Sequence, residues 1–192
     1  GARVSCRAGG IRCTLLSDRM TRSILLEVPD AAYGKRVADA LTENPKDLQR
    51  VTSTTSRYAR LEEVTTEHLG NLLFVRFAFT TGDAAGHNMT TKAADALRHH
   101  LLTSFPELTD VSVSGNFCTD KKVSAVNGIL GRGKQVIAEA VISEKWVRTY
   151  LRTTSAKMAE LNVRKNLLGS IAAGSLRSGN AHVANLLLGF YL

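Results

Sequence analysis

The sequence predicts an α+β protein, in which a small domain of strands and helices is followed by helical segments of a larger domain. Three observations support this fold class. The 192 residues are 44% hydrophobic, which is enough for a substantial core. Between residues 23 and 114 the hydrophobic pattern changes in the order strand, helix, strand, strand, helix, strand. After residue 142 the patterns are helical.

The first half of the small domain contains one strand and one helix. The apolar, β-branched run SILLEV (23–28) predicts the strand. Pro29 and Asp30 then begin a helical pattern that places apolar residues on one face up to about Thr42.

The second half contains a hairpin, a helix and a last strand. Apolar residues alternate along 71–80, so this stretch and 57–66 predict a hairpin. A helix is expected from Asn88 until Pro106 ends it, and 108–114 is again extended. The order is that of a ferredoxin-like βαββαβ arrangement, an antiparallel sheet with two helices on one face. A fold of this kind does not by itself specify a function.

The remainder predicts a strand at 135–142 and a helix that begins at Ser143 and runs to about Asn162. Two further helical pieces are expected, at 164–175 and 180–192. The last pattern has no polar stop, so we expect the chain to be a segment of a longer protein.

The composition excludes several kinds of function. A net charge of +8 suits nucleic acid or a phosphorylated small molecule. The cations are scattered and few aromatics lie among them, so we expect no nucleic acid. Three cysteines in no pairing or zinc pattern favour a reducing compartment. The five histidines lack partners at ligand spacing, so we expect no metal, and no apolar run is long enough to span a membrane.

One phosphate-binding motif is rejected. GILGRGKQ (128–135) fits G-x-x-x-x-G-K, but Gln135 replaces the Ser or Thr that would bind magnesium. A strand pattern follows where a P-loop needs the start of a helix. We therefore predict a hairpin turn at these residues.

Four other stretches carry groups suited to anions. The loop with Gly82 and Gly86 leads into a helix start that could attract an anion, although a plain helix cap explains it equally. Arg57 follows a run of hydroxyl residues and suits a phosphate monoester, with a polar surface loop as the alternative. At 114–128, an acid and two lysines could polarise a carbonyl or simply form a solvated turn. Lys165, His182 and Asn185 lie in a stretch rich in small residues, with the last two at helical i, i+3 spacing.

Five stretches in this order resemble class I hydroxymethylglutaryl-coenzyme A reductases and cover nearly the whole chain. They are SDRMTR (17–22), TSRYARL (55–61), GDAAGHNM (82–89), SGNFCTDKK with GRGK (114–134), and KNLLGSIAAGS with NAHVAN (165–185). The resemblance implies reduction of hydroxymethylglutaryl-coenzyme A (HMG-CoA) to mevalonate and coenzyme A by two hydride transfers from NADPH, the first committed step of isoprenoid synthesis.

The resemblance also implies roles for individual residues. Lys121 is the catalytic cation that polarises the substrate carbonyl, and Arg152 faces coenzyme A. The expected substrate-binding residues are Arg22, Ser114, Asp120, Lys122, Lys165, His182 and Asn185. The expected NADP-binding residues are Ser56, Arg57, Asp83, Gly86, Asn88 and Met89.

At the level of domains, the resemblance implies that 1–22 and 135–192 belong to a large helical domain. Residues 23–114 then form a ferredoxin-like NADP-binding domain, and 115–134 form the catalytic loop and connection. The expected protein is a homodimer or higher oligomer with active sites between subunits. It is cytoplasmic, or faces the cytosol if the parent chain has a membrane anchor.

The chain departs from the family pattern in one important respect. The catalytic Glu of a TTEG-like motif should lie before Gly1, and the catalytic Asp of a GQD-like motif should lie after Leu192. We therefore expect this segment alone to be inactive. Two alternatives remain: a basic βαββαβ RNA-binding module, which needs exposed aromatics on its central strands, and a regulatory domain that binds cofactor without chemistry.

Overall fold

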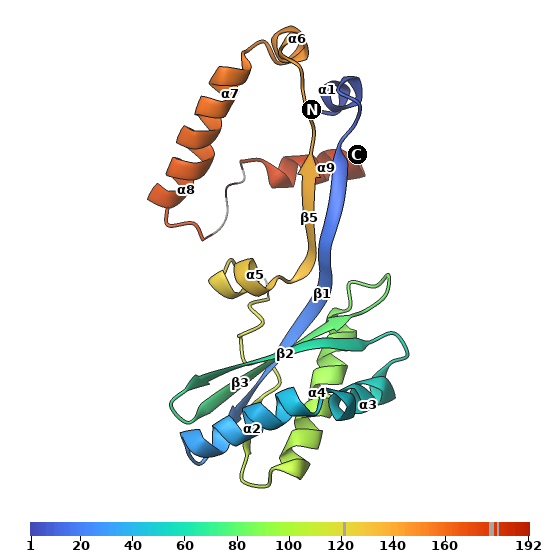
Figure 1. Ribbon diagram of the computed structural model, residues 1–192, viewed down its shortest axis with the longest axis vertical. Helices are drawn as coiled ribbons and strands as arrows, with labels where there is room; N and C mark the ends of the chain where they lie inside the picture. Colours follow the sequence, from blue (N-terminus) through green and yellow to red (C-terminus); the bar gives the residue numbers. More distant parts are fainter. Residues whose placement is uncertain (121, 177–178, 180) are drawn as a thin grey trace. The chain divides into compact units, whose positions relative to one another are not determined.

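The computed structural model describes residues 1–120, 122–176, 179 and 181–192 (Figure 1). The chain divides into two compact units, each described here by itself. The sheet unit comprises Leu16–Lys122 and Ile129–Gln135, and the helical unit comprises Gly1–Leu15, Val123–Gly128 and Val136–Leu192. Helices and antiparallel strands are both present, which confirms the predicted α+β class.

An antiparallel sheet organises the sheet unit, with strands in the order β2-β3-β1-β4. A fifth strand, β5, pairs with β1 off this path. The predicted hairpin is present, with Leu69 of β2 opposite Leu72 of β3. The strands are β1 (Arg12–Glu27), β2 (Arg60–Leu69), β3 (Leu72–Thr80), β4 (Thr109–Ser112) and β5 (Gly133–Glu139).

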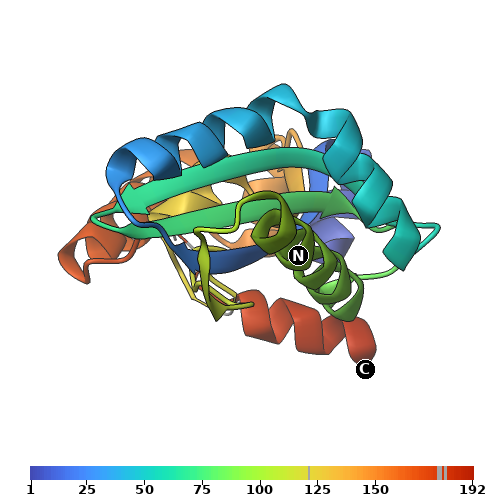
Figure 2. The same cartoon turned by 90° about the horizontal axis from the view of Figure 1, so that it is seen from below.

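Three helices complete the sheet unit: α2 (Ala31–Glu43), α3 (Pro45–Thr55) and α4 (His87–Ser104). Asp30 caps α2, because its carboxylate accepts a 2.7 Å hydrogen bond from the backbone N–H of Tyr33. Figures 1 and 2 show these helices on the same side of the sheet. The predictions for α2 and α4 are confirmed, whereas α3 was not predicted.

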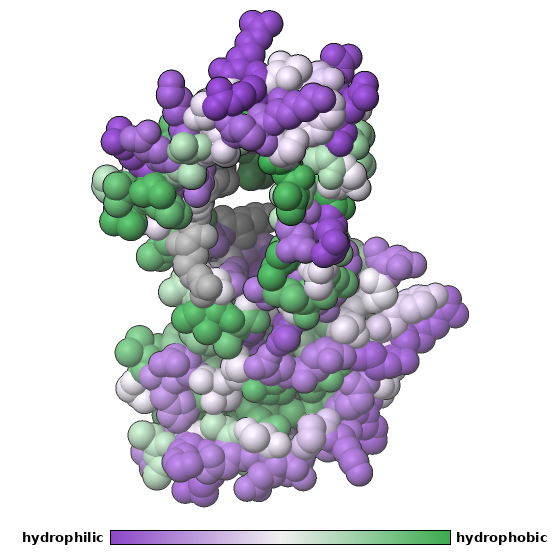
Figure 3. All heavy atoms as spheres, turned by 45° about the horizontal axis from the view of Figure 1, so that its top comes forward, coloured by the Kyte–Doolittle hydropathy of each residue, from purple (hydrophilic) through white to green (hydrophobic). Residues whose placement is uncertain are grey.

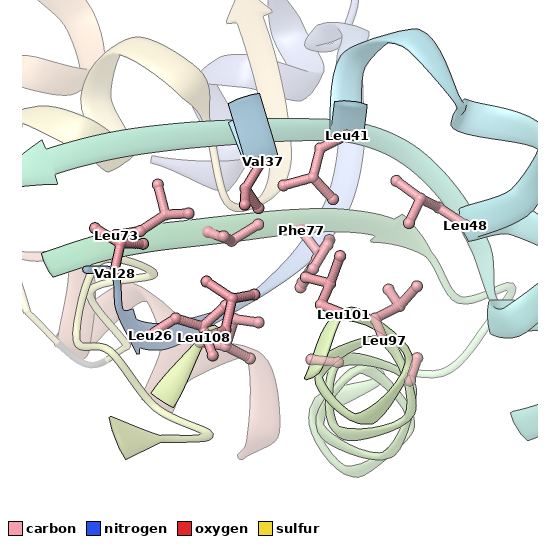
Figure 4. Packing of buried hydrophobic residues seen from close by; sticks show 14 of the residues in the cluster. Leu26, Val28, Val37, Leu41, Leu48, Leu73, Phe77, Leu97, Leu101 and Leu108 are labelled. Atoms are coloured by element: carbon pink, nitrogen blue, oxygen red, sulfur yellow. The ribbon is translucent and has the colours of Figure 1, made fainter. Parts of the chain in front are cut away.

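The core lies between this sheet face and the helices. Side chains on a strand alternate between faces, so Ile24 and Leu26 of β1 point the same way as Val75 and Phe77 of β3. Figure 4 shows Phe77 packing against leucines of α2 and α4. The buried cluster also includes Val28, Tyr33, Val37, Leu41, Leu48, Leu73, Phe79, Ala93, Ala94, Leu97, Leu101 and Leu108.

The helical unit corrects one prediction. The single helix expected from Ser143 to Asn162 is interrupted at Arg152, which has a left-handed φ of 54°. Thr154 then caps a new helix, because its hydroxyl accepts a bond from the N–H of Lys157. The segments are α1 (Ala2–Arg7), α5 (Ala125–Leu130), α6 (Glu144–Trp146), α7 (Ser155–Leu161), α8 (Gly169–Ala172), α9 (Val183–Tyr191) and the π-helical η1 (Val147–Leu151) and η2 (Asn162–Leu168).

The predicted turn at 128–135 is also corrected in part. Residues up to Leu130 form α5, and the chain then enters β5 at Gly133. A strand rather than a helix therefore follows the Gly-Lys pair, as the rejection of a P-loop required. In the described part of the chain, no helix is both long and apolar enough to cross a membrane.

Candidate functional site

The two stretches predicted to bind NADP meet at one end of the sheet. Arg60 at the start of β2 pairs with Thr80 at the end of β3, so the residues before β2 and after β3 are neighbours. A Cβ placed on Gly82 would lie 3.9 Å from the ring of Tyr58. The hairpin register thus brings together two segments that are separated by the whole β2–β3 hairpin in the sequence.

The loop after β3 has a compact internal structure. The Thr81 hydroxyl donates a 2.6 Å hydrogen bond to the carbonyl of Ala84. Gly86 has a φ of 80°, and a Cβ there would come within 2.3 Å of the Thr81 side chain, so only glycine fits. α4 begins directly afterwards, and no side chain of the described residues caps its N terminus. Its first backbone N–H groups are therefore available to an anion.

The predicted cofactor side chains differ in exposure. Asp83 and Asn88 are exposed, whereas Met89 is half-buried. Ser56 follows α3, and its hydroxyl accepts a 3.1 Å hydrogen bond from the N–H of Tyr58. The Arg57 guanidinium lies 4.7 Å from the centre of the Tyr58 ring, and among the described residues no carboxylate pairs with it.

A hollow of about 320 Å³ lies beside the loop after β3. Lys134 of β5 contributes to its lining and pairs with the carboxylate of Asp18 on β1. The remaining lining residues are Met20, Thr81, Asp83, Ala84, Ala85 and Gly133. One lysine and two carboxylates, those of Asp18 and Asp83, therefore border this hollow.

Residues 115–120, called the anchored loop below, directly precede the predicted catalytic lysine and pack on the face of the sheet opposite the helices. Ser23 of β1 anchors it twice: its carbonyl accepts a 3.2 Å bond from Gly115 N, and its hydroxyl accepts a 3.1 Å bond from Cys118 N. Gly115 approaches β1 so closely that a Cβ would lie 3.0 Å from the carbonyl oxygen of Ile24. The rings of Phe117 and Phe74 pack at 6.0 Å.

Charged groups surround this loop. Lys122 Nζ donates a 3.0 Å hydrogen bond to Asn116 Oδ1, and Asp120 forms a 3.0 Å ion pair with Arg132. Burial raises the pKa of the Cys118 thiol, but hydrogen bonds with Ser23 and with the backbone of Asp120, together with the charge of Arg22, leave that pKa below its ordinary value. The predicted catalytic Lys121 lies outside the described residues.

The other predicted substrate residues fall into two sets. In the sheet unit, Arg22 is half-buried opposite Phe77, and Ser114 is exposed just before the anchored loop. In the helical unit, Lys165 is exposed on η2. His182 Nδ1 and Asn185 Nδ2 lie 2.9 Å apart, so the structure brings these two together.

Arg152, predicted to face coenzyme A, is exposed at the break after η1. Arg148 and Lys157 line the same open hollow of about 380 Å³, together with Thr153 and Thr154. The local charge is therefore positive, as a phosphate would require. In the described part of the chain, no three His, Cys, Asp or Glu side chains converge as metal ligands.

Sequence reasoning missed two arginines at the anchored loop. Arg76 is buried in β3 and donates to the carbonyl of Gly131, and Arg132 pairs with Asp120. The signal for Arg76 was available, because it is the one charged residue in the otherwise apolar and hydroxyl stretch 72–80. The role of Arg132 depends on a tertiary contact that the sequence does not reveal.

Comparisons with known proteins agree with these features. The family model for hydroxymethylglutaryl-coenzyme A reductase matches residues 1–192. The 3-hydroxy-3-methylglutaryl-coenzyme A reductase of Pyrococcus horikoshii is 44% identical over 193 residues, which is all of this chain and 46% of that protein. The reductase of Strongylocentrotus purpuratus is 41% identical over 194 residues, again all of this chain but 21% of that protein. The chain thus spans less than half the length of these relatives.

Solved structures show a shared fold. The class II 3-hydroxy-3-methylglutaryl-CoA reductase of Streptococcus pneumoniae bound to NADPH has a TM-score of 0.60 and 18% identity, over 90% of this chain and 43% of that chain. The family match covers every residue of this chain, and the two relatives named above are 41% and 44% identical to it. The chain therefore belongs to the hydroxymethylglutaryl-coenzyme A reductase family.

Proposed function

We propose that the protein to which this chain belongs reduces HMG-CoA with two NADPH and two protons, yielding mevalonate, coenzyme A and two NADP⁺. One observation carries the proposal: in a member of this family, the two stretches with NADP-binding character converge at one end of the sheet. Within the described residues, no side chain caps the start of α4 and no carboxylate pairs with Arg57, so this helix start and this guanidinium offer two sites for phosphate groups.

NADPH supplies the hydride when it is bound. The Arg57 guanidinium and the Ser56 hydroxyl hold its 2′-phosphate, because a planar guanidinium pairs well with phosphate oxygens. Asp83 and the residues from Gly86 to Met89 bind the rest of the molecule. The close fit of Gly86 against Thr81 supports this role, because it fixes the loop and the helix start together.

Lys121 donates a hydrogen bond to the thioester oxygen and stabilises the negative charge that develops as hydride adds. Such stabilisation is strongest where water is excluded. Arg22, Ser114, Asp120 and Lys122 hold the hydroxymethylglutaryl group from the sheet unit. Lys165, His182 and Asn185 contribute from the helical unit, and Arg152 binds a coenzyme A phosphate.

The strand order and antiparallel pairing support a ferredoxin-like NADP-binding domain over about residues 23–114, in which each helix-containing crossover skips one strand. By the family likeness, the protein works as a homodimer or larger oligomer with active sites between subunits. Phe77 and Phe79 of β3 are fully buried and Phe74 is half-buried with its ring packed against Phe117, which counts against the RNA-binding alternative.

A stoichiometric assay tests the proposal. The protein at its natural full length is incubated with NADPH and HMG-CoA, and NADPH oxidation and mevalonate formation are both measured. We expect two NADPH to be consumed for each mevalonate, and no oxidation when acetyl-CoA replaces the substrate. NADPH binding without any oxidation would instead support a regulatory domain, and the absence of both would contradict the proposal.

A further inference from the structure

A buried arginine underlies the anchored loop. Arg76 of β3 is 1% exposed, and its Nη2 donates a 2.6 Å hydrogen bond to the carbonyl oxygen of Gly131. Among the described residues, its Nε and Nη1 have no hydrogen-bond partner. Burial lowers the pKa of Arg76, and the charge of nearby Glu63 opposes that shift. A cation buried with so little compensation is costly, which indicates that its one bond serves a purpose.

Arg132, the residue after Gly131, contacts the anchored loop. Arg132 Nη2 lies 3.0 Å from Asp120 Oδ1, with side chains that are 15% and 25% exposed. Asp120 directly precedes Lys121 in the sequence. A continuous series of contacts therefore runs from Arg76 through the backbone of Gly131 and Arg132 to Asp120.

The other end of the loop is held separately. Ser23, which pairs with Arg76 across β1 and β3, accepts bonds from Gly115 N and Cys118 N. These bonds fix the backbone before Asp120, whereas Arg132 fixes the Asp120 side chain itself. The loop is thus attached to the sheet at two points on the same face.

We propose that Arg132, supported by Arg76, is a positioning residue that fixes Asp120, the residue that precedes Lys121 in the sequence. The inference rests on the proposed function, because Lys121 matters only if it polarises the thioester. Neither arginine touches the reacting atoms in this proposal. Their effect on rate arises from orientation, for which a displacement of about 1 Å can cost roughly 100-fold.

Three variants test the series of contacts. Arg132→Gln removes the charge with little change in size, Arg132→Lys restores a cation, and Arg76→Gln removes the buried support. Arg98→Gln is the matched control, because Arg98 is 12% exposed and pairs with Asp95 of α4 and Asp110 of β4, which lie in the same unit but outside residues 113–122. Arg132→Gln changes a partly exposed residue, so it can be studied even if Arg76→Gln fails to fold.

The first measurement is hydrogen exchange of the 113–122 backbone. In Arg132→Gln we expect exchange there to rise about tenfold, as when one charge-assisted bond is lost, with α4 unchanged. Arg98→Gln should leave 113–122 unaffected. This measurement requires no activity, so it gives a result even if the proposed function fails. Unaltered exchange of 113–122 in Arg132→Gln would overturn the inference.

The second measurement separates kinetic constants in the full-length protein. In Arg132→Gln we expect kcat to fall about 100-fold, the KM for HMG-CoA to rise, and the KM for NADPH to stay the same. Arg132→Lys should recover part of kcat, because lysine again offers Asp120 a cation. A purely structural role would lower both substrate affinities and would appear in Arg98→Gln too. Either that pattern, or an unchanged kcat of Arg132→Gln when the wild type is active, would reject the inference. An inactive wild type would instead reject the proposed function.

Discussion

Three arginines of the sheet unit differ in the groups that contact their guanidinium charge. Arg98 pairs with two carboxylates, Arg76 is buried against a carbonyl, and Arg57 is exposed beside the Tyr58 ring with no carboxylate partner in the part of the chain that the structure describes. Arg57 thus keeps its charge and most of its hydrogen-bond donors for an external anion. This difference supports its assignment to the 2′-phosphate.

The exposed charge of Arg57 leads to a prediction about cofactor choice. Arg57→Ala should weaken NADPH binding by about 10-fold or more, the effect of losing a charge-assisted hydrogen bond, and leave NADH binding unchanged. Fluorescence titration of both nucleotides measures this. Arg50→Ala, which changes an exposed arginine of α3 paired with Asp47, is the control. Equal losses for NADPH and NADH would contradict the assignment.

A second residue prediction concerns pH. The hydrogen bond from Arg50 lowers the pKa of Asp47, and the nearby charge of His100 adds to this effect despite partial opposition from burial. A lowered folded-state pKa stabilises the protein above the ordinary aspartate value of about 3.9, and the benefit is lost as pH falls through the folded-state pKa. Thermal unfolding of Asp47→Asn should therefore differ most from wild type at neutral pH. A difference that stays constant down to pH 3 would refute this linkage.

At the scale of elements, the sequence did not predict the helix α3, because half of its residues have weak helix propensity. Its second half is Thr52, Ser53, Thr54 and Thr55, a run that favours loops because hydroxyls compete with the backbone. In the structure each hydroxyl donates to a carbonyl three or four residues earlier. Burial of Leu48 and Thr52 against α4 and the sheet overrides the weak propensity. Pro45 at the first turn was the available signal.

The strands were predictable for the opposite reason. Alternation along 71–80 reports which side chains face the core, and the hairpin follows from it. The break at Arg152 was not recognised, although the two threonines after it form a helix-cap signal. Boundaries were less predictable than elements: the strand expected at 23–28 is the last part of a strand that begins at Arg12.

The loop after β3 provides a prediction with a matched control. Gly86 and Gly70 both have positive φ, but a Cβ would clash with Thr81 at Gly86 and meet nothing within 4 Å at Gly70. Each alanine substitution should cost about 1 kcal/mol from the left-handed backbone. Gly86→Ala should cost more in urea unfolding and should also weaken NADPH binding. Equal costs at both positions would show that the contact with Thr81 is unimportant.

At the scale of the whole molecule, the site residues come from segments that only the fold unites. The resemblance assigned roles, but the meeting of 56–58 with 81–86 depends on the register of β2 and β3. The attachment of 113–122 to β1 likewise depends on tertiary hydrogen bonds. The chemical role of each residue could therefore be proposed from the sequence, whereas the tertiary contacts that bring these residues together could not.

The helical unit exposes many large apolar side chains. Figure 3 shows hydrophobic patches at the molecular surface. Exposed apolar surface of this extent is typical of a face that contacts other protein. In the helical unit it includes Leu161, Leu167, Leu168, Ile171, Leu186, Leu187, Leu188 and Phe190.

The family resemblance leads to a prediction for residues 1–192 produced alone. Because the resemblance places the catalytic Glu and Asp motifs outside these residues, we expect the segment to form no mevalonate from HMG-CoA and NADPH. Product analysis by mass spectrometry tests this, with the full-length protein as the positive control. Mevalonate formed by the segment alone would show that its own residues suffice.

The most direct test of the whole account is a single-turnover reduction by the full-length protein with Lys121→Gln. The variant should bind NADPH and HMG-CoA as the wild type does, because neither phosphate site is altered. Its rate of hydride transfer should fall by at least roughly 100-fold, since the developing negative charge loses its cation. Hydride transfer at the wild-type rate would contradict the claim that this lysine activates the thioester.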